Sequence, residues 1–470
     1  MTVLRDFVLA CVAYLLTVYG VSFALSAIAF FENRSRIRES AAEGWETIER
    51  SRFTIPVSVI APTHNEEVLC VAVVEALLAL EYPELEVIIA NDGSTDSTLE
   101  RLREAFDLQP FERFERRVLP TKAVHAVYRS RVDERLTVID KVAGGNKADS
   151  LNAGINFARF RYVCCVDGDT IYEPRALLSS MRLVLRDPAH VVGLTSQIVV
   201  ATHPELPYRH TPGLAASTLL HNFQHLEYLR SFLSARLAWS RLNSIVCTSG
   251  AFMLYRRDVL EAVGGYSPDF SCEDIELTFR VHEHFLRRGV PYRILAMPEP
   301  VARTEGPDRI RTLTSQRARW QRVMLETAWH YRHMAFNPRY GRFGMISFPF
   351  MILSEVLAPF IELIALATLA AAAIVGAVHW ADYGLAVVLM SLAIASVTVL
   401  AVRLEDAGTR SYRFVDLVWL TVLSPLELVV YRPILFWAHL RGAFGFFRGD
   451  THWERFDRNL REAPSRLELL

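Results

Sequence analysis

Cysteine is scarce in this 470-residue chain and follows no metal-binding or disulfide pattern. The six cysteines are scattered, with no C-x-x-C pair and no zinc-type spacing. Disulfide scaffolds and zinc modules place their cysteines at regular, short intervals. The scatter disfavours both classes and indicates buried thiols in a reducing compartment.

Excess charge and glycine-rich phosphate loops are also lacking. The net charge is −1, so no global field favours nucleic acid as a partner. Neither G-x-G-x-x-G nor G-x-x-x-x-G-K-[ST] occurs, and "AGGNKAD" is not a Walker loop. A dehydrogenase and a P-loop NTPase are therefore disfavoured.

Long apolar runs, by contrast, predict membrane helices. Phe7–Phe31 carries no charge over 25 residues and can span about 30 Å of hydrocarbon. A signal peptide would have a shorter apolar core and a small-residue cleavage site, so a retained helix is favoured. Two further runs, Tyr383–Val402 and Val356–Val378, predict two more spans, the second interrupted by Glu362.

Arginines that flank these runs predict their topology. "RSRIR" after the first helix places the block Arg34–Tyr340 in the cytoplasm. The apolar stretch Phe414–Leu440 is broken by Pro425 and Pro433, and Arg-rich segments lie on both of its sides. We therefore expect an interfacial or re-entrant segment there, with the tail on the cytoplasmic side.

Between the membrane segments, strand-like and helix-like runs alternate. "PVSVIAPTH" (56–64) and "LEVIIANDG" (85–93) each predict a buried strand that ends in a turn. "LTVIDKV", "KADSLNAGINFARF" and "RYVCCVDGD" continue the alternation as strand, helix and strand. This order predicts an α/β fold with a mainly parallel sheet covered on both faces. The polar, basic region Glu112–Arg135 is expected to be an insertion or an extended loop.

Polar residues follow the predicted strands, where ligands gather in open parallel sheets. Asn65 and Glu66 follow the first strand, and Asp92 follows the second. "VDGDT" places Asp167 and Asp169 where two carboxylates can share a hard cation that also binds phosphate. An ordinary acidic turn is the alternative for this pair, and turn chemistry is the alternative for "NDG" around Asp92.

Two predicted helices begin with charged residues that suit transfer chemistry. Lys147 opens "KADSLNAG" and either neutralises a diphosphate or is a solvated surface lysine. Glu273, Asp274 and Glu276 begin "EDIELTFRV". Acidic residues favour the N-terminal end of a helix, and one of them can also act as a general base toward an attacking hydroxyl.

The stretch "QRARW" combines arginines with a tryptophan shortly before an apolar region. Gln316, Arg319 and Trp320 share one helix face, whereas Arg317 and Arg319 lie on different faces. An arginine fork binds phosphate, and a tryptophan face packs against a sugar ring. The alternative is a basic interfacial helix with a tryptophan anchor. Spacing alone does not decide between the two.

The order of these motifs resembles the membrane-bound family 2 glycosyltransferases, which include processive synthases of cellulose, chitin oligosaccharides, hyaluronan and poly-N-acetylglucosamine. The motifs are "APTHNEE", "NDGSTD", "KADSLNAG", "DGD", "CED" and "QRARW", and the match covers nearly the whole chain. The resemblance implies a GT-A-like nucleotide-diphospho-sugar transferase domain flanked by transmembrane and interfacial helices. The implied parts are a transmembrane helix (1–33), a cytoplasmic glycosyltransferase domain (34–340), transmembrane and interfacial helices (341–440), and a cytoplasmic gating-loop-like tail (441–470).

The resemblance also implies roles for individual residues. Asp274 would be the catalytic base, and Asp167 and Asp169 would hold the metal. Trp320 would stack on the acceptor sugar at the mouth of a transmembrane channel. The implied donor and nucleotide ligands are Thr63, Asn65, Glu66, Asp92, Lys147, Asp167, Gln316, Arg317 and Arg319. The implied acceptor ligands are Ser249, Gly250, Glu273 and Trp320, and the implied gating residues are Trp453 and Arg455.

The implied activity is inverting and processive transfer from a UDP-sugar, with UDP-GlcNAc the first expectation and UDP-glucose the second. Mg2+ or Mn2+ is the implied cofactor. The implied location is the inner (plasma) membrane, multi-pass, with the growing polysaccharide, the lipid bilayer and an accessory export or synthase subunit as partners. A non-processive transferase that adds one sugar to a lipid, and a catalytically dead membrane scaffold, are the alternatives.

Two departures from the family pattern stand out. His64 occupies a position where the family usually has tyrosine, so the uracil contact of that tyrosine is not carried over. "CED" replaces "TED", which leaves the acid in place.

Glu355 and Glu362 lie seven residues apart and are expected to share a helix face in the membrane. That face, joined by Glu427 of the proline-broken stretch, lines an exit path for polymer, or else Glu355 lies among headgroups and Glu362 lies against a neighbouring helix.

Overall fold

The chain folds into two compact units. A computed structural model describes residues 2–42, 54–168, 170–200, 218–304, 306–374, 376, 380–409 and 412–449. The described residues of the first unit, called the sheet unit, lie within Arg38–His210 and Ile245–Glu305. Those of the second, called the helical unit, lie within Met1–Ile37, Thr211–Ser244 and Gly306–Phe456.

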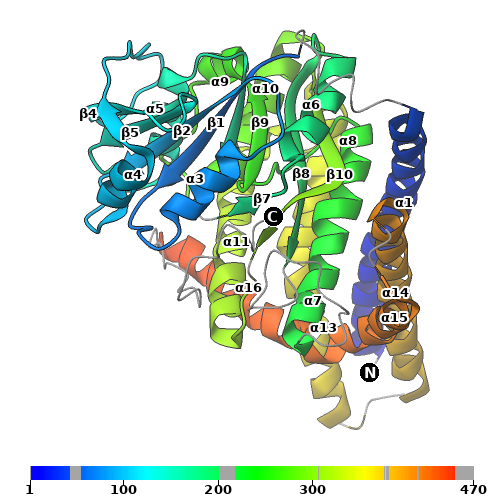
Figure 1. The fold of residues 1–470 in the computed structure, drawn as a ribbon. Helices are drawn as coiled ribbons and strands as arrows, with labels where there is room; N and C mark the ends of the chain where they lie inside the picture. The colour runs from blue at the N-terminus through cyan, green and yellow to red at the C-terminus, as the bar shows by residue number, and fades with distance from the viewer. Residues whose placement is uncertain are drawn as a thin grey trace. The chain divides into compact units, whose positions relative to one another are not determined.

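The sheet unit is built on one mixed sheet in the order β3-β4-β5-β2-β1-β6-β9-β8-β10-β7 (Figure 1). The central strands β5, β2, β1 and β6 are parallel, and antiparallel pairs flank them. The strands are β1 Val57–Thr63, β2 Leu85–Asp92, β3 Leu108–Pro110, β4 Val124–Ser130, β5 Leu136–Lys141, β6 Tyr162–Val166, β7 Ile171–Tyr172, β8 Val191–Val200, β9 Phe252–Arg256 and β10 Arg293–Thr304.

Helices cover both faces of this sheet because its central strands are apolar on both faces. Val59 and Ala61 of β1 point into one hydrophobic core, which also holds residues of the helices α3 and α6. Ile60, between them, lies against the opposite face, where a Cβ added to Gly154 of α5 would come within 2.3 Å of its side chain. The helices of the unit are α3 Cys70–Leu78, α4 Thr98–Phe106, α5 Lys147–Phe157, α6 Ala176–Arg186, α9 Arg257–Val263 and α10 Glu273–Arg288.

One expected loop is a strand. The region Glu112–Arg135 contains β4 (Val124–Ser130), which pairs antiparallel with β5. Among the strands that the structure describes, the three-residue strand β3 alone lies beyond β4, so β4 is close to the edge of the sheet and is partly exposed. Edge strands tolerate polar residues, and this explains why the polar composition hid the strand.

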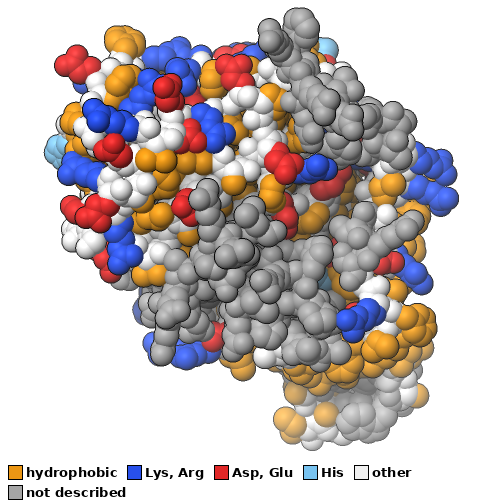
Figure 2. All heavy atoms as spheres, viewed as in Figure 1, with side chains coloured by type: hydrophobic (Ala, Val, Ile, Leu, Met, Phe, Trp, Pro, Cys, Tyr) orange, Lys and Arg blue, Asp and Glu red, His pale blue; other side chains and the backbone are white. Residues whose placement is uncertain are grey.

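The helical unit contains three helices that are long and apolar enough to cross a membrane. Among the described residues these candidate spans are Leu9–Arg38, Phe343–Ile374 and Val387–Ala407. Hydrophobic side chains gather on the surface over α14 and α15 (Figure 2), and Leu392 and Val429 are 61% and 71% exposed. The described helices of the unit are α1 Thr2–Ala42, α7 Leu219–Tyr228, η2 Leu229–Ala235, α8 Arg236–Arg241, α11 Ile310–His330, η3 Arg332–Met334, η4 Pro338–Tyr340, η5 Phe343–Ser347, α12 Phe348–Met351, η6 Ile352–Leu357, α13 Ala358–Ile374, α14 Trp380–Thr409, α15 Phe414–Val430 and α16 Arg432–Arg448.

The proline-broken stretch forms two helices bent against each other by 50°. Helix α15 continues through Pro425 and ends at Val430, and α16 begins at Arg432. This geometry fits both a broken span, which would be a fourth crossing, and a re-entrant loop.

Candidate active site

The carboxyl ends of the parallel strands bring the first group of expected residues together. Thr63 of β1 is paired with Asn91 of β2, so the loops that follow both strands begin side by side. Asn65, in a left-handed backbone conformation with φ of 54°, accepts a hydrogen bond at its Oδ1 from the Thr95 amide (2.7 Å). The Glu66 amide donates to Thr98 Oγ1 (2.9 Å). These contacts join the two loops into one rim.

Asp92 ends β2 and is fixed by groups from three neighbouring segments. Its Oδ1 accepts hydrogen bonds from the Gly144 amide (2.8 Å) and from the Lys141 ammonium. Its main-chain oxygen lies 2.8 Å from Nδ1 of His64. The side chain is 11% exposed, so one edge of the carboxylate is within reach of solvent.

Lys141, which the sequence did not single out, is the fully buried cation behind Asp92. Its side chain is 0% exposed, and its ammonium pairs with Asp92 and with Asp149 Oδ2 (2.6 Å). A buried ammonium needs such partners because desolvation of an unpaired charge is costly. Lys141 therefore ties β5, β2 and α5 together beneath the rim. The one feature of the sequence that could have indicated Lys141 was its position at the end of a predicted buried strand.

A second group gathers around Lys147, the first residue of α5. Its ammonium donates to Asp167 Oδ1 (2.6 Å) and to the Gly250 carbonyl (2.8 Å), and it pairs with Glu273 Oε1 (3.1 Å). Burial alone lowers the pKa of Lys147, but the carboxylates of Asp167 and Glu273 outweigh it and hold that pKa well above its ordinary value. Lys147 is thus a stable cation beside the strand-end carboxylate.

Asp167 follows β6 and keeps a partly open carboxylate. Its side chain is 34% exposed, and its amide donates to the Tyr172 hydroxyl (2.9 Å). The next residue is Gly168, where an added Cβ would stand 1.9 Å from the Pro62 carbonyl oxygen, so only glycine fits against β1 there. Tyr172, a further residue that the sequence did not reveal, also donates to the Ala251 carbonyl (2.6 Å).

Asp274, at the N-terminal end of α10, faces the same cluster. Its Oδ2 accepts a hydrogen bond from the Gly250 amide (2.8 Å), and its Oδ1 accepts from the Ile275 amide (2.6 Å) and the Cys272 thiol (3.1 Å). A Cβ added to Gly250 would lie 3.0 Å from Asp274 Oδ2 and 3.6 Å from Lys147 Nζ. Gly250 therefore stands between the expected base and the expected diphosphate lysine.

The structure describes Ser249 but not three other residues that were expected at the site. Ser249 is buried, and its amide donates to Thr195 Oγ1 (2.9 Å). Asp169, Trp453 and Arg455 lie outside the described residues. Within the described part of the chain, no group of three or more His, Cys, Asp and Glu side chains is arranged to hold a metal ion.

The "QRARW" residues belong to α11 of the helical unit. Trp320 is half-buried and packs with the rings of Tyr228 (6.2 Å between centroids) and Phe232 (6.4 Å). Arg317 is only 2% exposed and forms a two-pronged ion pair with Glu227 (2.9 and 2.8 Å). Gln316 accepts a hydrogen bond from Arg317.

The central parallel strands with charged residues at their carboxyl ends, together with Asp274 at a helix start, define a GT-A-like domain. The fold resembles a mannosyltransferase from Pyrobaculum calidifontis, solved in complex with GDP-Man and Mn2+. Its TM-score is 0.55 at 17% identity, over 94% of this chain and 99% of that chain.

Family models agree with this assignment. The model described as Glycosyl transferase family group 2 matches residues 162–404, more than half of the chain, and the model described as Glycosyl transferase family 2 matches residues 58–264. The chain therefore belongs to the glycosyl transferase family group 2, as its motifs predicted.

Similarity to curated proteins supports the same family. Poly-beta-1,6-N-acetyl-D-glucosamine synthase of Staphylococcus epidermidis is 26% identical over 277 residues, which are 58% of this chain and 56% of that protein. The synthase of the same name from Staphylococcus aureus strain COL is 25% identical over 264 residues, 56% of this chain and 53% of that protein. The chain thus spans about half the length of the curated relatives it matches.

Proposed function

We propose that the protein is an inverting, processive glycosyltransferase that polymerises a sugar from a UDP-sugar into a β-linked polysaccharide and extrudes it across the inner membrane. The observation that carries the proposal is the placement of Gly250 between the Asp274 carboxylate and the Lys147 ammonium. A base for the acceptor and a cation for the leaving diphosphate are thereby each held by a hydrogen bond to one small residue. UDP-GlcNAc is the preferred donor, because the relatives at 25–26% identity are N-acetylglucosamine polymer synthases, and UDP-glucose is the second.

The proposed reaction follows from the chemistry of these side chains. Asp274 takes the proton of the acceptor hydroxyl, whose oxygen attacks C1 of the donor sugar. The bond between C1 and the diphosphate oxygen breaks, UDP leaves, and the configuration at C1 inverts. Asp274 Oδ1 already accepts two hydrogen bonds, whereas Oδ2 accepts one and keeps a lone pair, so Oδ2 can receive that proton.

Lys147 supplies a fixed positive charge for the departing diphosphate. Its raised pKa keeps it protonated throughout the neutral range, so it acts as an electrostatic stabiliser and not as an acid. Lys141 and Gly144 hold Asp92 at the rim of the sheet, and these contacts support Asp92 as the proposed nucleotide ligand.

A divalent cation, Mg2+ or Mn2+, would neutralise charge on the donor diphosphate. The oxygen chemistry of Asp167 and its 34% exposed side chain fit such an ion, and Asp169 is the second proposed ligand. The mannosyltransferase with the same fold was solved with Mn2+.

The membrane arrangement is also a proposal. The three candidate spans and the arginines that follow the first of them support a multi-pass protein with its sheet unit in the cytoplasm. The growing polysaccharide would leave through the membrane, and an accessory export or synthase subunit is a proposed partner.

A donor screen tests the proposal. The purified protein in lipid nanodiscs is incubated with UDP-GlcNAc or UDP-glucose, with Mg2+, Mn2+ or a chelator, and released UDP is measured. We expect release with UDP-GlcNAc that requires a divalent ion. Normal nucleotide binding without any UDP release would instead favour a dead scaffold, and uniform addition of one sugar to lipid would favour the non-processive transferase.

A further inference from the structure

Arg317 lies in the motif "QRARW", but its fork is already used inside the protein. Nε and Nη2 donate to the two carboxylate oxygens of Glu227 at 2.9 and 2.8 Å, and Nη1 donates to Gln316. The side chain is 2% exposed. A phosphate needs the same fork that Glu227 occupies. These contacts do not suit the role of a donor-diphosphate ligand.

The same guanidinium packs against the aromatic residue of the motif. Its carbon lies 4.1 Å from the ring centroid of Trp320 and 5.8 Å from that of Tyr228. Tyr228 in turn stacks on Phe232, with centroids 4.6 Å apart. A cation over an aromatic face is attractive, and more so where water is excluded.

We propose that Arg317 is a positioning residue, whose ion pair with Glu227 holds the guanidinium against Trp320 and so fixes that ring for the acceptor sugar. This inference rests on the proposed transferase function. Arg317 would then act on the acceptor side of the reaction and not on the donor side, and elongation would also depend on Glu227.

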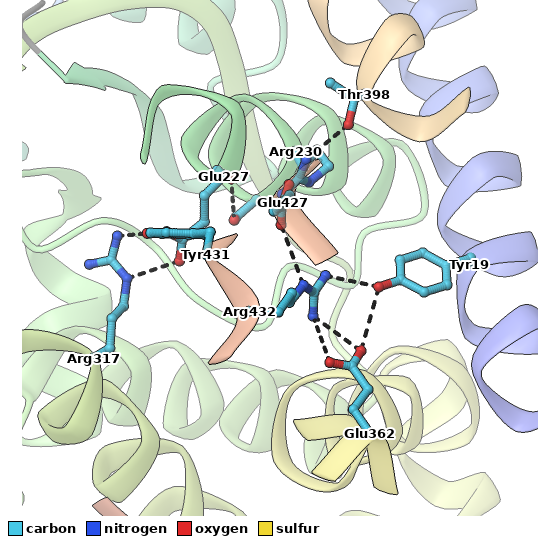
Figure 3. A network of polar contacts seen from close by, with 10 residues as sticks. Tyr19, Glu227, Arg230, Arg317, Glu362, Thr398, Glu427, Tyr431 and Arg432 are labelled. Carbon is cyan, nitrogen blue, oxygen red and sulfur yellow. Dashed lines mark hydrogen bonds and ion pairs between the residues drawn. The ribbon is translucent and has the colours of Figure 1, made fainter. Parts of the chain in front are cut away.

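Glu227 has a further partner, which connects the Arg317–Glu227 ion pair to the apolar helices of the same unit. The Tyr431 hydroxyl donates to Glu227 Oε2 (2.6 Å) at the bend between α15 and α16 (Figure 3). The next residue, Arg432, donates to Glu362 of α13 (3.1 Å) and to the Tyr19 hydroxyl of α1 (2.9 Å).

Two more contacts extend the network. Glu427 of α15 lies 3.4 Å from Arg432 and accepts a hydrogen bond from Arg230 (2.8 Å), and Arg230 donates to Thr398 of α14 (2.9 Å) (Figure 3). Charges in such apolar surroundings persist only when they are paired. The position of Trp320 is therefore tied, through Glu227 and Tyr431, to the packing of α1, α13 and α14 around the bend between α15 and α16.

The test separates donor binding from elongation, using the full-length protein in nanodiscs. UDP-GlcNAc is the donor and a labelled oligomer of β-1,6-linked N-acetylglucosamine is the acceptor probe. Donor KM is measured from UDP release, and the length of the products is measured by mass spectrometry. Transfer by the unaltered protein is established first, so that a failure of the proposed function is seen separately.

Glu227→Gln and Arg317→Met should each leave the donor KM within about 2-fold and reduce elongated product about 10- to 100-fold, because small misplacements of a binding group have effects of this size. The double variant should be no worse than Arg317→Met alone, since the two side chains act as one unit. Tyr431→Phe removes one hydrogen bond and should give the same pattern more weakly, which keeps the test decisive where the charge variants do not fold.

Arg311→Met is the matched control, because Arg311 is an exposed arginine on the same helix. It should change neither quantity. The proposal is overturned if Arg317→Met raises the donor KM 10-fold or more while Glu227→Gln does not, since Arg317 would then bind the diphosphate. Additive losses in the double variant, or an equal effect of Arg311→Met, would also overturn it.

Discussion

Asp274→Asn separates the chemistry from the binding of the donor. Asparagine keeps the shape of the side chain and can still accept from the Ile275 amide and the Cys272 thiol through its oxygen. Its amide group then faces the Gly250 amide, which loses its acceptor. This donor is partly buried, so leaving it unsatisfied costs at most about 1–3 kcal/mol of folding stability.

The expected effect on the rate is larger than this structural cost. A general base contributes about 100- to 10,000-fold, which corresponds to about 3–5.5 kcal/mol of activation free energy. Donor binding should change by less than about 3-fold, because Lys147 keeps its contacts with Asp167 and the Gly250 carbonyl.

The assay measures UDP release and, separately, the Kd of UDP by calorimetry on the same preparation. Glu276→Gln is the control, because Glu276 lies in the first turn of the same helix and pairs with Arg280 (2.6 Å). It should retain the rate within about 3-fold, as expected for a carboxylate outside the reaction. A rate loss below about 10-fold for Asp274→Asn, or an equal loss of UDP affinity, would refute the role of base.

Three further predictions concern the sheet core and the acceptor side. Lys141→Met leaves the buried Asp92 and the partly buried Asp149 without their shared cation. We expect a loss of about 3–5 kcal/mol in stability and a higher donor KM, and unchanged unfolding would contradict this. Trp320→Ala should shorten the products with nucleotide affinity intact, and an unchanged length distribution would make Trp320 a membrane anchor. Burial lowers the pKa of His282 from 6.5 to about 4, so the ring stays neutral in the folded protein down to about pH 4. The stability that the neutral ring contributes is complete above pH 6.5 and falls by about 1.4 kcal/mol for each pH unit between pH 6.5 and about pH 4. His282→Gln should flatten that part of the acid-stability curve, and an equal slope would show that other groups cause it.

Much of the sheet unit could be predicted because its central strands carry a local signal. Strands β1, β2 and β6 are apolar on both faces and end in charged turns, so both their type and their functional edge are visible in the sequence. Strand β4 was missed because it lies near the sheet edge, where polar residues are tolerated and hide the pattern.

The contacts of individual charged residues could not be read in the same way. Arg317 and Glu227 are ninety positions apart, and nothing near Glu227 marks it as a partner. The burial of Lys141 depends likewise on Asp149, a residue of the next helix. The sequence left two positions open for Glu362, one lining an exit path for polymer and one against a neighbouring helix. Its ion pair with Arg432 (3.1 Å) favours the position against a neighbouring helix. Such pairings are set by tertiary packing, which sequence spacing does not encode.

The length and linkage of the product test the central claim most directly. Membranes that contain the protein are supplied with radiolabelled UDP-GlcNAc and Mn2+, and the labelled product is analysed by size and by linkage analysis, with Asp274→Asn membranes alongside. We predict a β-linked polymer of many sugar units that is absent from the variant. A product with one added sugar, or a polymer made equally by Asp274→Asn, would contradict it.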